Sequence, residues 1–368
     1  MKNLEPIYKN ISRTTRTNKN VHLSKEELII LQSEEMITLG IETSCDEMAA
    51  SVIKGGREIL SNVISTQIPL HQKFGGVVPE IASRKHILNI MPVIDEAVRS
   101  AEMELSDINQ IAVTYGPGLV GALLVGVSAA KTLAFALDVP LIAVNHLEGH
   151  IFANFLSHTE LEPPFLSLIV SGGHTALIKM NDYNNFEMLG QTRDDAAGEA
   201  FDKIARVMGL PYPGGPEIDR LAKIGNAEAV EFPIAKVDDY DFSFSGLKSA
   251  VLNYLNSAKM KGEVINNADV AASFQKAVID ALVEKTLHAA EEFGFDKIVL
   301  AGGVAANSAL ESTLRVSCER RGVNFYYPSK ILCTDNAAMI ACRGYYQSLE
   351  KNFANDRLNA VPGLGLLA

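Results

Sequence analysis

The chain has 368 residues, of which 47% are hydrophobic and 21% are charged, and its formal net charge at pH 7 is −11. The length suits two lobes better than one core, and the composition is that of a soluble globular protein, which argues against a membrane-spanning chain. Proteins that bind nucleic acid alone usually carry a basic stripe, so this acidic chain is expected to need a local patch or a partner for that task.

Residues 1–36 form a polar extension that differs from the rest of the chain. Its first 25 residues hold six basic side chains and one acidic side chain, and residues 25–31 indicate a short helix. No apolar segment of a secretory signal is present. The four cysteines of the whole chain form no CxxC pair, which fits a reducing compartment. We interpret residues 1–36 as a disordered extension of a cytoplasmic protein, with an organelle transit peptide as the minor alternative.

The globular part is expected to start at residue 37 with a β-hairpin. Two apolar runs, 37–41 and 48–53, flank the polar segment ETSCDE at residues 42–47. Carboxylates and hydroxyls at a hairpin tip can orient a phosphate, a metal-bound water or an attacking amine, which makes Asp46 and Glu47 candidate catalytic residues. A solvated turn is the plainer alternative.

A second set of patterns predicts a strand at residues 111–115, followed by GPGL and a long apolar stretch at 119–137. Glycine, serine and lysine interrupt this stretch, so it is interpreted as a buried helix rather than a membrane span. Residues 141–144 predict a further strand, which leads directly to His146.

The order of patterns then starts again in the second half. Residues 165–170 predict a strand, SGGHT at 171–175 a turn and 176–180 a returning strand; the strand at 297–300 precedes AGGVAAN and a helix. Strand, turn and return strand in both halves indicate a weak internal repeat. We therefore expect two α/β lobes around a cleft, with the turns facing it and with helices at 270–293 and 335–350 covering the sheets.

Three segments between these strands are expected to connect or flank the lobes. PYPGGPE at 211–217 suggests a rigid loop, and residues 231–249 suggest an irregular loop or hairpin. DDAAGEAFDK at 194–203 predicts the start of a helix with Glu199, Asp202 and Lys203 in its first turns. Acidic residues are common at helix starts for electrostatic reasons alone.

The sharpest chemical motif is NHLEGH at residues 145–150. On a helix, His146 and His150 lie one turn apart on one face, so both imidazoles can reach one metal ion. Asp335, near the start of the last predicted helix, is the best candidate for a third ligand, and two histidines with one carboxylate leave positions open for substrate. Two surface or capping histidines are the alternative.

Two glycine turns are candidates for binding a phosphate or nucleotide. In SGGHT, Gly172 and Gly173 allow close backbone approach, and their N–H groups can form an anion nest beside Ser171 and His174. AGGVAAN places glycines after a strand and at a helix start, a position that suits phosphate. Each motif alone is also compatible with an ordinary turn.

Taken together, the motifs resemble those of the tRNA N6-adenosine threonylcarbamoyltransferases, formerly described as O-sialoglycoprotein endopeptidases. The resemblance extends from about residue 37 to residue 346 in the right order, over eight separated segments: TSCDE, NHLEGH, SGGHT, GEAFDK, YPGGPEID, FSFSGLKSAV, AGGVAAN and PSKILCTDNAAMIA. One departure is Met48, which stands where Thr is commoner.

The resemblance implies a two-lobed actin/Hsp70/sugar-kinase-like α/β fold with an interlobe cleft. We divide the chain into the extension 1–36, an N-terminal lobe 37–145 completed by a C-terminal helix 336–357, and a C-terminal lobe 146–335. The resemblance also implies an acyltransferase reaction, in which threonylcarbamoyl passes from threonylcarbamoyl-AMP to N6 of adenosine 37 in tRNAs that read codons beginning with A. A shorter paralogue and a small ATPase are the implied bacterial partners.

The resemblance also implies site residues, at the positions of this sequence that match the motifs of the family. A divalent metal, Fe²⁺ first and Zn²⁺ second, would be held by His146, His150 and Asp335. Asp46, Glu47 and His174 are the catalytic candidates. The substrate adenylate would be held by Ile169, Val170, Ser171, Gly172, Gly173, Asp202, Gly215, Asp219 and Asn307.

Three other functions remain as alternatives. A small-molecule kinase of the same superfamily would share the lobes and glycine turns, but imidazoles are poor ligands for the Mg²⁺ that a kinase needs. An inactive paralogue acting as a scaffold would be expected to lose the histidine pair. A zinc peptidase needs Glu directly after the first histidine, whereas Leu147 follows His146 here.

Overall fold

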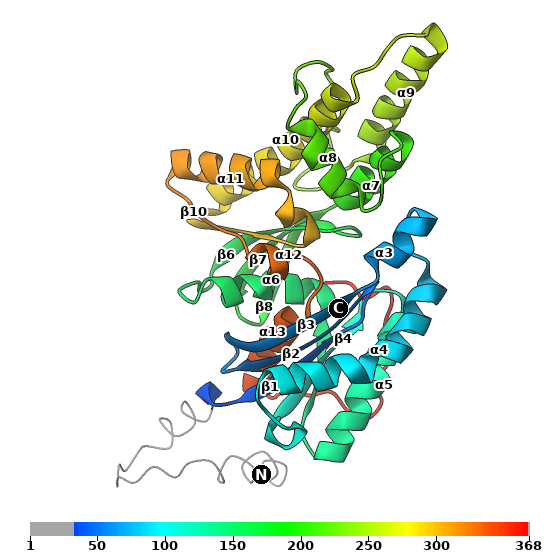
Figure 1. Cartoon of the computed structure of the whole chain (residues 1–368). Helices are drawn as coiled ribbons and strands as arrows, with labels where there is room; N and C mark the ends of the chain where they lie inside the picture. The colour runs from blue at the N-terminus through cyan, green and yellow to red at the C-terminus, as the bar shows by residue number, and fades with distance from the viewer. Residues whose placement is uncertain (1–32, 367–368) are drawn as a thin grey trace.

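The computed structural model describes residues 33–366, which contain two five-stranded sheets flanked by helices (Figure 1). The predicted helix at residues 25–31 lies outside the described residues. Between the larger elements lie short helical turns: α3 (Ile68–His71), η1 (Gln72–Phe74), η2 (Leu105–Asp107), η3 (Gly303–Ala306) and α12 (Lys330–Cys333).

The first sheet has the strand order β3-β2-β1-β4-β5. Its strands are β1 (Ile37–Glu42), β2 (Glu47–Lys54), β3 (Glu58–Thr66), β4 (Gln110–Gly116) and β5 (Leu141–Asn145). β1, β2 and β3 are antiparallel neighbours, whereas β4 runs parallel to β1 and β5 parallel to β4. The β1–β2 pair is the predicted hairpin, and residues 43–46 form its turn.

Helices cover both faces of this sheet, so β1, β2, β4 and β5 are largely buried, whereas most of the edge strand β3 is half-buried or exposed. One apolar core joins the sheet to α4 (Pro79–Ser100) and α5 (Val120–Leu137). The other joins it to α6 (His146–Ser157) and to α13 (Ala337–Leu349), which returns from the end of the chain to pack on β1, β2 and β4. Met48, which directly follows TSCDE, is fully buried in the first core, so its side chain does not line the site.

The second sheet has the order β10-β9-β6-β7-β8. Its strands are β6 (Phe165–Val170), β7 (Thr175–Asp182), β8 (Asn185–Gln191), β9 (Lys297–Ala301) and β10 (Asn324–Tyr326). β6, β7 and β8 are antiparallel neighbours, while β9 and β10 continue in parallel from β6. Read from its other edge, this is the topology of the first sheet, which confirms the internal repeat.

The helices of the second half gather on a core that contains β6, α7 and α10. They are α7 (Ala197–Val207), α8 (Gly214–Ala222), α9 (Ser245–Lys261), α10 (Asn267–Phe293) and α11 (Ser308–Arg321). Two loop predictions were partly wrong: Gly214 already begins α8, and Ser245 begins α9, so only the first parts of the segments 211–217 and 231–249 are irregular. Asp335 lies two residues before α13 rather than inside it.

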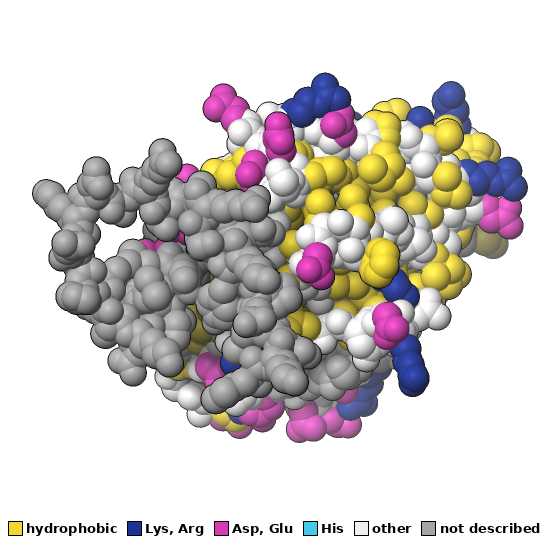
Figure 2. All heavy atoms as spheres, turned by 90° about the horizontal axis from the view of Figure 1, so that it is seen from below, with side chains coloured by type: hydrophobic (Ala, Val, Ile, Leu, Met, Phe, Trp, Pro, Cys, Tyr) yellow, Lys and Arg dark blue, Asp and Glu magenta, His cyan; other side chains and the backbone are white. Residues whose placement is uncertain are grey.

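Helix α5 is long and apolar enough to cross a membrane by length and composition alone, the one such helix among the described residues. It packs on β4 and on α4, as expected for a helix that covers a sheet, but only 39% of it is buried. Yellow side chains gather on the underside of the molecule, where α4 and α5 lie in Figure 1 (Figure 2). This α4–α5 face includes the exposed side chains Ile87, Leu88, Met91, Val120 and Leu124.

Candidate metal centre and substrate site

The two histidines of NHLEGH lie at the start of α6, directly after β5. The side chain of Asn145 accepts a hydrogen bond from the N–H of Leu147, which caps the helix and places His146 as its first residue. His150 follows one turn later, and the two ring centroids are 4.6 Å apart. Both side chains are buried, so they face the interior rather than solvent.

The turn that carries Asp335 is fixed by the next residue, Asn336. The buried Asn336 side chain donates to the carbonyls of Leu332 and Thr334 and accepts from the N–H of Met339, so it joins α12 to α13. Helix α13 in turn packs closely on α6. Gly149 lies at this contact, and a Cβ there would lie 2.7 Å from the end of the Ile340 side chain, which would have to move.

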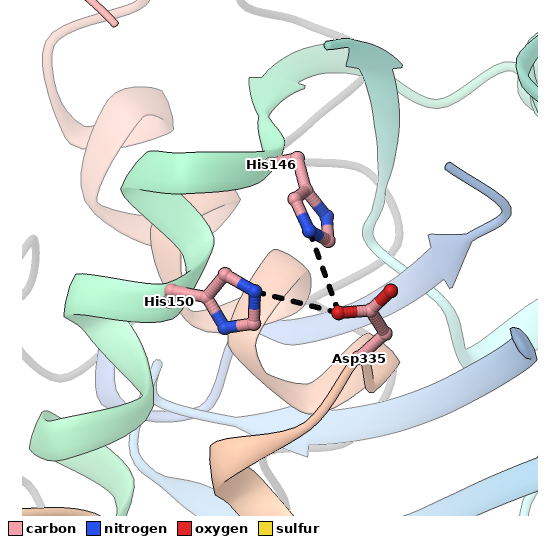
Figure 3. Close-up of side chains that lie close together, drawn as sticks. All are labelled: His146, His150 and Asp335. Atoms are coloured by element: carbon pink, nitrogen blue, oxygen red, sulfur yellow. Dashed lines mark ion pairs between the residues drawn. The ribbon is translucent and has the colours of Figure 1, made fainter. Parts of the chain in front are cut away.

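Asp335 thereby meets both histidines, although it is far from them in the sequence (Figure 3). Its Oδ1 lies 3.4 Å from Nε2 of His146 and 3.4 Å from Nε2 of His150. Three donor atoms bound at about 2.1 Å to one tetrahedral ion lie about 3.4 Å from one another. The three residues offer ligand atoms that all lie within 4.8 Å of each other.

The chemistry of these donors also fits a cation. Both ring nitrogens of His150 are buried without a hydrogen-bond partner, which is costly unless something else occupies them. Two imidazoles and a carboxylate are the donor set of sites that bind iron or zinc and leave positions open. The residues present therefore fit the implied metal ion.

Burial and mutual charge set the protonation of this cluster. Burial opposes the charge of Asp335, but the adjacent His146 outweighs it and holds the pKa of the carboxyl well below its ordinary value. Burial likewise opposes a charge on His146, yet Glu42 and Asp335 raise its pKa well above the usual range. Burial lowers the pKa of His150. The cluster is thus built around fixed negative charge that attracts a positive partner.

Glu42, which the sequence analysis did not single out, is fully buried at the end of β1. Its carboxylate accepts the N–H of Ser44 at 2.5 Å and the hydroxyl of Thr114, and it lies 3.1 Å from Nδ1 of His146. The parallel pairing of β1 with β4 brings Thr114 next to it. A largely apolar strand that ends in an acidic residue was the one local sign of this role.

The β1–β2 turn also presents Asp46 and Glu47. Burial raises the pKa of both carboxyls, that of Glu47 to about 7, and one oxygen of each has no hydrogen-bond partner. The other oxygen of Glu47 accepts the hydroxyl of Thr66 at 2.8 Å. His86 on α4, a second residue that the sequence analysis missed, fixes the turn through Nε2, 2.8 Å from the carbonyl of Cys45.

The SGGHT turn joins β6 and β7. The N–H of Ser171 donates to the carbonyl of His174 at 2.8 Å, which closes the turn, and a Cβ on Gly172 or Gly173 would meet no atom within 4 Å. Burial, together with the charges of His146 and His150, lowers the pKa of His174 to about 4, so a neutral His174 lies close to the histidine pair. The turn therefore offers open backbone beside the centre.

Ile169 and Val170 precede this turn, and their side chains belong to two different apolar cores. The side chains of these two predicted substrate residues are therefore not available to a ligand, and their backbones pair with β7 and, at Ile169, also with β9. Asp202 and Gly215 lie together, since Asp202 accepts the N–H of Gly214 at 2.7 Å, and the space beside Gly215 is open.

Tyr212 connects this region to the first lobe. Burial raises the pKa of its hydroxyl, and so do the charges of Asp46 and Asp202. The two aspartates, from different lobes, therefore lie near the same side chain. The sequence motif PYPGGPE predicted only a loop at Tyr212 and no role for its side chain.

Asp219 and Asn307 lie together at the start of α11, where both carboxylate oxygens of Asp219 accept the hydroxyl of Ser308 at 2.9 Å. The side chain of Asn307 accepts the N–H groups of Ala309 and Leu310 and donates to Gln275, so it is engaged in capping the helix. A substrate contact by the Asn307 side chain would have to share these hydrogen bonds.

Comparison with known proteins places the chain among relatives of one kind. The tRNA N6-adenosine threonylcarbamoyltransferase family matches residues 58–342. The enzyme of that name from Clostridioides difficile strain 630 is 59% identical over 332 residues, which are 90% of this chain and 98% of the relative. The enzyme of that name from Clostridium perfringens strain 13 is 59% identical over 335 residues, 90% of this chain and 99% of the relative.

Solved structures similar to this one share much less sequence. HypF from T. kodakarensis has a TM-score of 0.61 at 15% identity, and full-length HypF in a phosphate- and nucleotide-bound form has 0.58 at 17%. They match 88% and 87% of this chain, which spans only 50% and 47% of their lengths. Component A of an Acidaminococcus fermentans (R)-2-hydroxyglutaryl-CoA dehydratase has a TM-score of 0.51 at 16% identity, over 86% of this chain and all of that one. These likenesses show the actin-like two-lobed fold.

Proposed function

The chain belongs to the tRNA N6-adenosine threonylcarbamoyltransferase family, and from that premise we propose that it transfers threonylcarbamoyl from threonylcarbamoyl-AMP to N6 of adenosine 37, in tRNAs that read codons beginning with A. The bond from N6 to the carbamoyl carbon forms, the bond from that carbon to the phosphate oxygen breaks, and AMP leaves with the electron pair. The observation that carries this proposal is the convergence of His146, His150 and Asp335 close to His174.

The chemistry assigns the protein two tasks. The exocyclic amine of adenosine is a poor nucleophile because its lone pair is delocalised into the ring, whereas the mixed anhydride is already activated. The enzyme therefore has to position the two reactants and stabilise the charge that develops between them. His146, His150 and Asp335 would hold Fe²⁺ or Zn²⁺, which when bound supplies positive charge for oxygens of the donor.

The SGGHT turn and the start of α8 are proposed to hold the adenylate. Gly172, Gly173 and Gly215 leave open space beside the backbone, and N–H groups at such turns bind phosphate oxygens. Asp202, already an acceptor of backbone N–H groups, orders the start of α8 next to this space. The neutral His174 supplies a polar group without adding charge to the centre.

Asp46 is proposed as the base that accepts the proton of the N6 amine. One of its oxygens has no partner, and Asp46 lies near Tyr212 of the other lobe, as expected for a residue beside the substrates. Glu47 is the neighbouring candidate, and its pKa of about 7 suits proton transfer near neutral pH.

A partner of related fold is proposed to cover the α4–α5 face. A contiguous exposed apolar face on two packed helices is typical of a protein interface. A shorter paralogue of the same fold would carry an equivalent helix pair, so the two faces can pair with approximate twofold symmetry. Leu88, 69% exposed, is then expected to be essential: Leu88→Glu should abolish co-purification of the paralogue and leave the thermal unfolding of the chain unchanged, whereas retained binding would reject this face.

The kinase alternative is not favoured, because the relatives are named tRNA N6-adenosine threonylcarbamoyltransferases rather than kinases, and the histidine pair suits Mg²⁺ poorly. A single-turnover assay with synthetic threonylcarbamoyl-AMP, unmodified tRNA and the bacterial partners tests the proposal. We expect one N6-threonylcarbamoyladenosine per tRNA by mass spectrometry. An unmodified tRNA together with ATP-dependent phosphorylation of a small molecule would contradict it.

A further inference from the structure

Glu42 is the fully buried acid behind the histidine pair, and it has no place in the reaction so far described. We propose that Glu42 is a positioning residue that holds His146 with its Nδ1 protonated, so that the Nε2 lone pair is directed at the position shared with His150 and Asp335. This inference rests on the proposed metal centre and adds to it a residue that selects which nitrogen of His146 binds.

The two nitrogens of His146 have different surroundings. Nδ1 lies 3.1 Å from Oε2 of Glu42 and 3.2 Å from the hydroxyl of Ser44, whereas Nε2 lies 3.4 Å from Oδ1 of Asp335. A carboxylate can only accept hydrogen bonds, so Nδ1 carries a proton toward Glu42. When an ion occupies the position shared with His150 and Asp335, Nε2 is then the nitrogen left to bind it. A carboxylate on the far nitrogen is the arrangement that fixes the ring and raises its strength as a ligand.

Glu42 itself has little freedom to move. One of its oxygens accepts the N–H of Ser44 at 2.5 Å, and the other accepts the hydroxyl of Thr114 as well as facing His146. These donors come from the β1–β2 turn and from β4, so the orientation of the carboxylate is tied to the first sheet. The orientation of the His146 ring therefore depends on the first sheet, through Glu42, as well as on α6.

His150 provides an internal contrast. Neither of its ring nitrogens has a hydrogen-bond partner, although the ring is buried. Nothing among the described residues holds its tautomer in the way that Glu42 holds that of His146. We therefore expect His146 to be oriented before an ion arrives, and His150 to be oriented by the ion.

The test compares Glu42→Gln with Thr114→Val. Glu42→Gln keeps the shape but lets an amide N–H face Nδ1, which favours the wrong tautomer; Thr114→Val removes a neighbour of Glu42 and leaves the contact with His146. Zn²⁺ affinity is measured on metal-free full-length protein by competition with a chelating dye. We expect a 10- to 100-fold loss for Glu42→Gln, typical of losing such a partner, and a smaller loss for Thr114→Val, which loosens Glu42 but keeps its carboxylate next to Nδ1.

A second measurement needs no variant. In the zinc-loaded chain with ¹⁵N-labelled histidine, NMR should find a proton on Nδ1 of His146 and zinc on Nε2; zinc on Nδ1 would overturn the inference even if Glu42→Gln does not fold. Equal zinc affinities of Glu42→Gln and the unaltered chain would also overturn it while leaving the metal centre intact. Failure of the unaltered chain to bind zinc or iron would instead remove the metal centre, and this inference with it.

Discussion

Two turns occupy the same position in the two sheets, yet they have opposite character. The β1–β2 turn is filled with polar side chains that are almost completely buried, including Thr43, Ser44 and Asp46. The β6–β7 turn instead exposes Gly172 and Gly173, beside which there is open space. One topology therefore carries two tasks: the first turn holds charged groups in fixed positions, and the second leaves room for a ligand.

The largest effect is expected where the two turns meet, at Asp335. Asp335→Ala removes the oxygen that both imidazoles face, so we expect loss of bound metal. Charge stabilisation by a bound ion is worth several kcal/mol, so transfer should fall about a thousandfold or more. Metal content and single-turnover transfer are measured together. The control is Glu187→Ala, which removes an exposed acid of β8. Unchanged metal content and unchanged transfer in Asp335→Ala would contradict the proposed role of Asp335 as a ligand.

The next effect tests the fixed turn by itself. Asp46→Asn keeps the size of the side chain but removes the base, so we expect transfer to fall by at least about a hundredfold. Adenylate binding, measured by calorimetry with a non-hydrolysable analogue, should stay the same because the open turn is unaltered. Unchanged single-turnover transfer in Asp46→Asn would rule Asp46 out and point to Glu47.

A smaller effect tests the open turn. Gly172→Val places a side chain where no atom lies within 4 Å of the added Cβ, so the fold should be unaffected while adenylate affinity falls by about tenfold or more. Gly198→Ala is the matched contrast, because its Cβ would lie 2.5 Å from the carbonyl of Ser171. That variant should lose stability, by about 1–3 kcal/mol. Thermal unfolding measures the stability of each variant, and calorimetry measures its adenylate affinity. Equal losses of stability and affinity in both variants would contradict the proposal that the β6–β7 turn leaves room for the ligand.

The smallest effect concerns the pH dependence of stability. Because the pKa of Glu47 is raised to about 7, the folded state binds its proton more tightly than the unfolded state does. Glu47 therefore lowers stability progressively as the pH rises from about 4.5 to about 7, and its contribution is constant above that range. Glu47→Gln should remove this slope, so its gain in unfolding temperature over the unaltered chain should grow between pH 5 and pH 7.5. A gain that is the same at every pH would show that Glu47 is not buried as a neutral acid.

The sequence predicted the parts of the fold and of the site that depend on local pattern. Alternating and continuous apolar runs gave the hairpin at β1–β2 and the strands β6 and β9, and helical spacing brought His146 next to His150. Such patterns depend on neighbours within a few positions. For the same reason they offered Asp335 only as the best candidate for a third ligand, and the resemblance supported that assignment.

The residues that were missed depend on contacts between distant segments. Glu42 is bound to Thr114, 72 positions away, and its role follows from burial at the centre of a sheet. Gly214 begins a helix because Asp202 accepts its N–H, whereas a segment rich in glycine and proline suggested a loop. Asn307 was expected to bind substrate, and its capping of α11 became visible only when the start of that helix was known.

The central claim is that His146, His150 and Asp335 bind one ion between the two turns. Anomalous diffraction at the iron and zinc absorption edges, from crystals of protein purified without chelators, tests it most directly. We predict a single anomalous peak bonded to Nε2 of each histidine and to a carboxylate oxygen of Asp335. Crystals of active protein with no peak at this position, or with the ion held by other residues, would contradict the account.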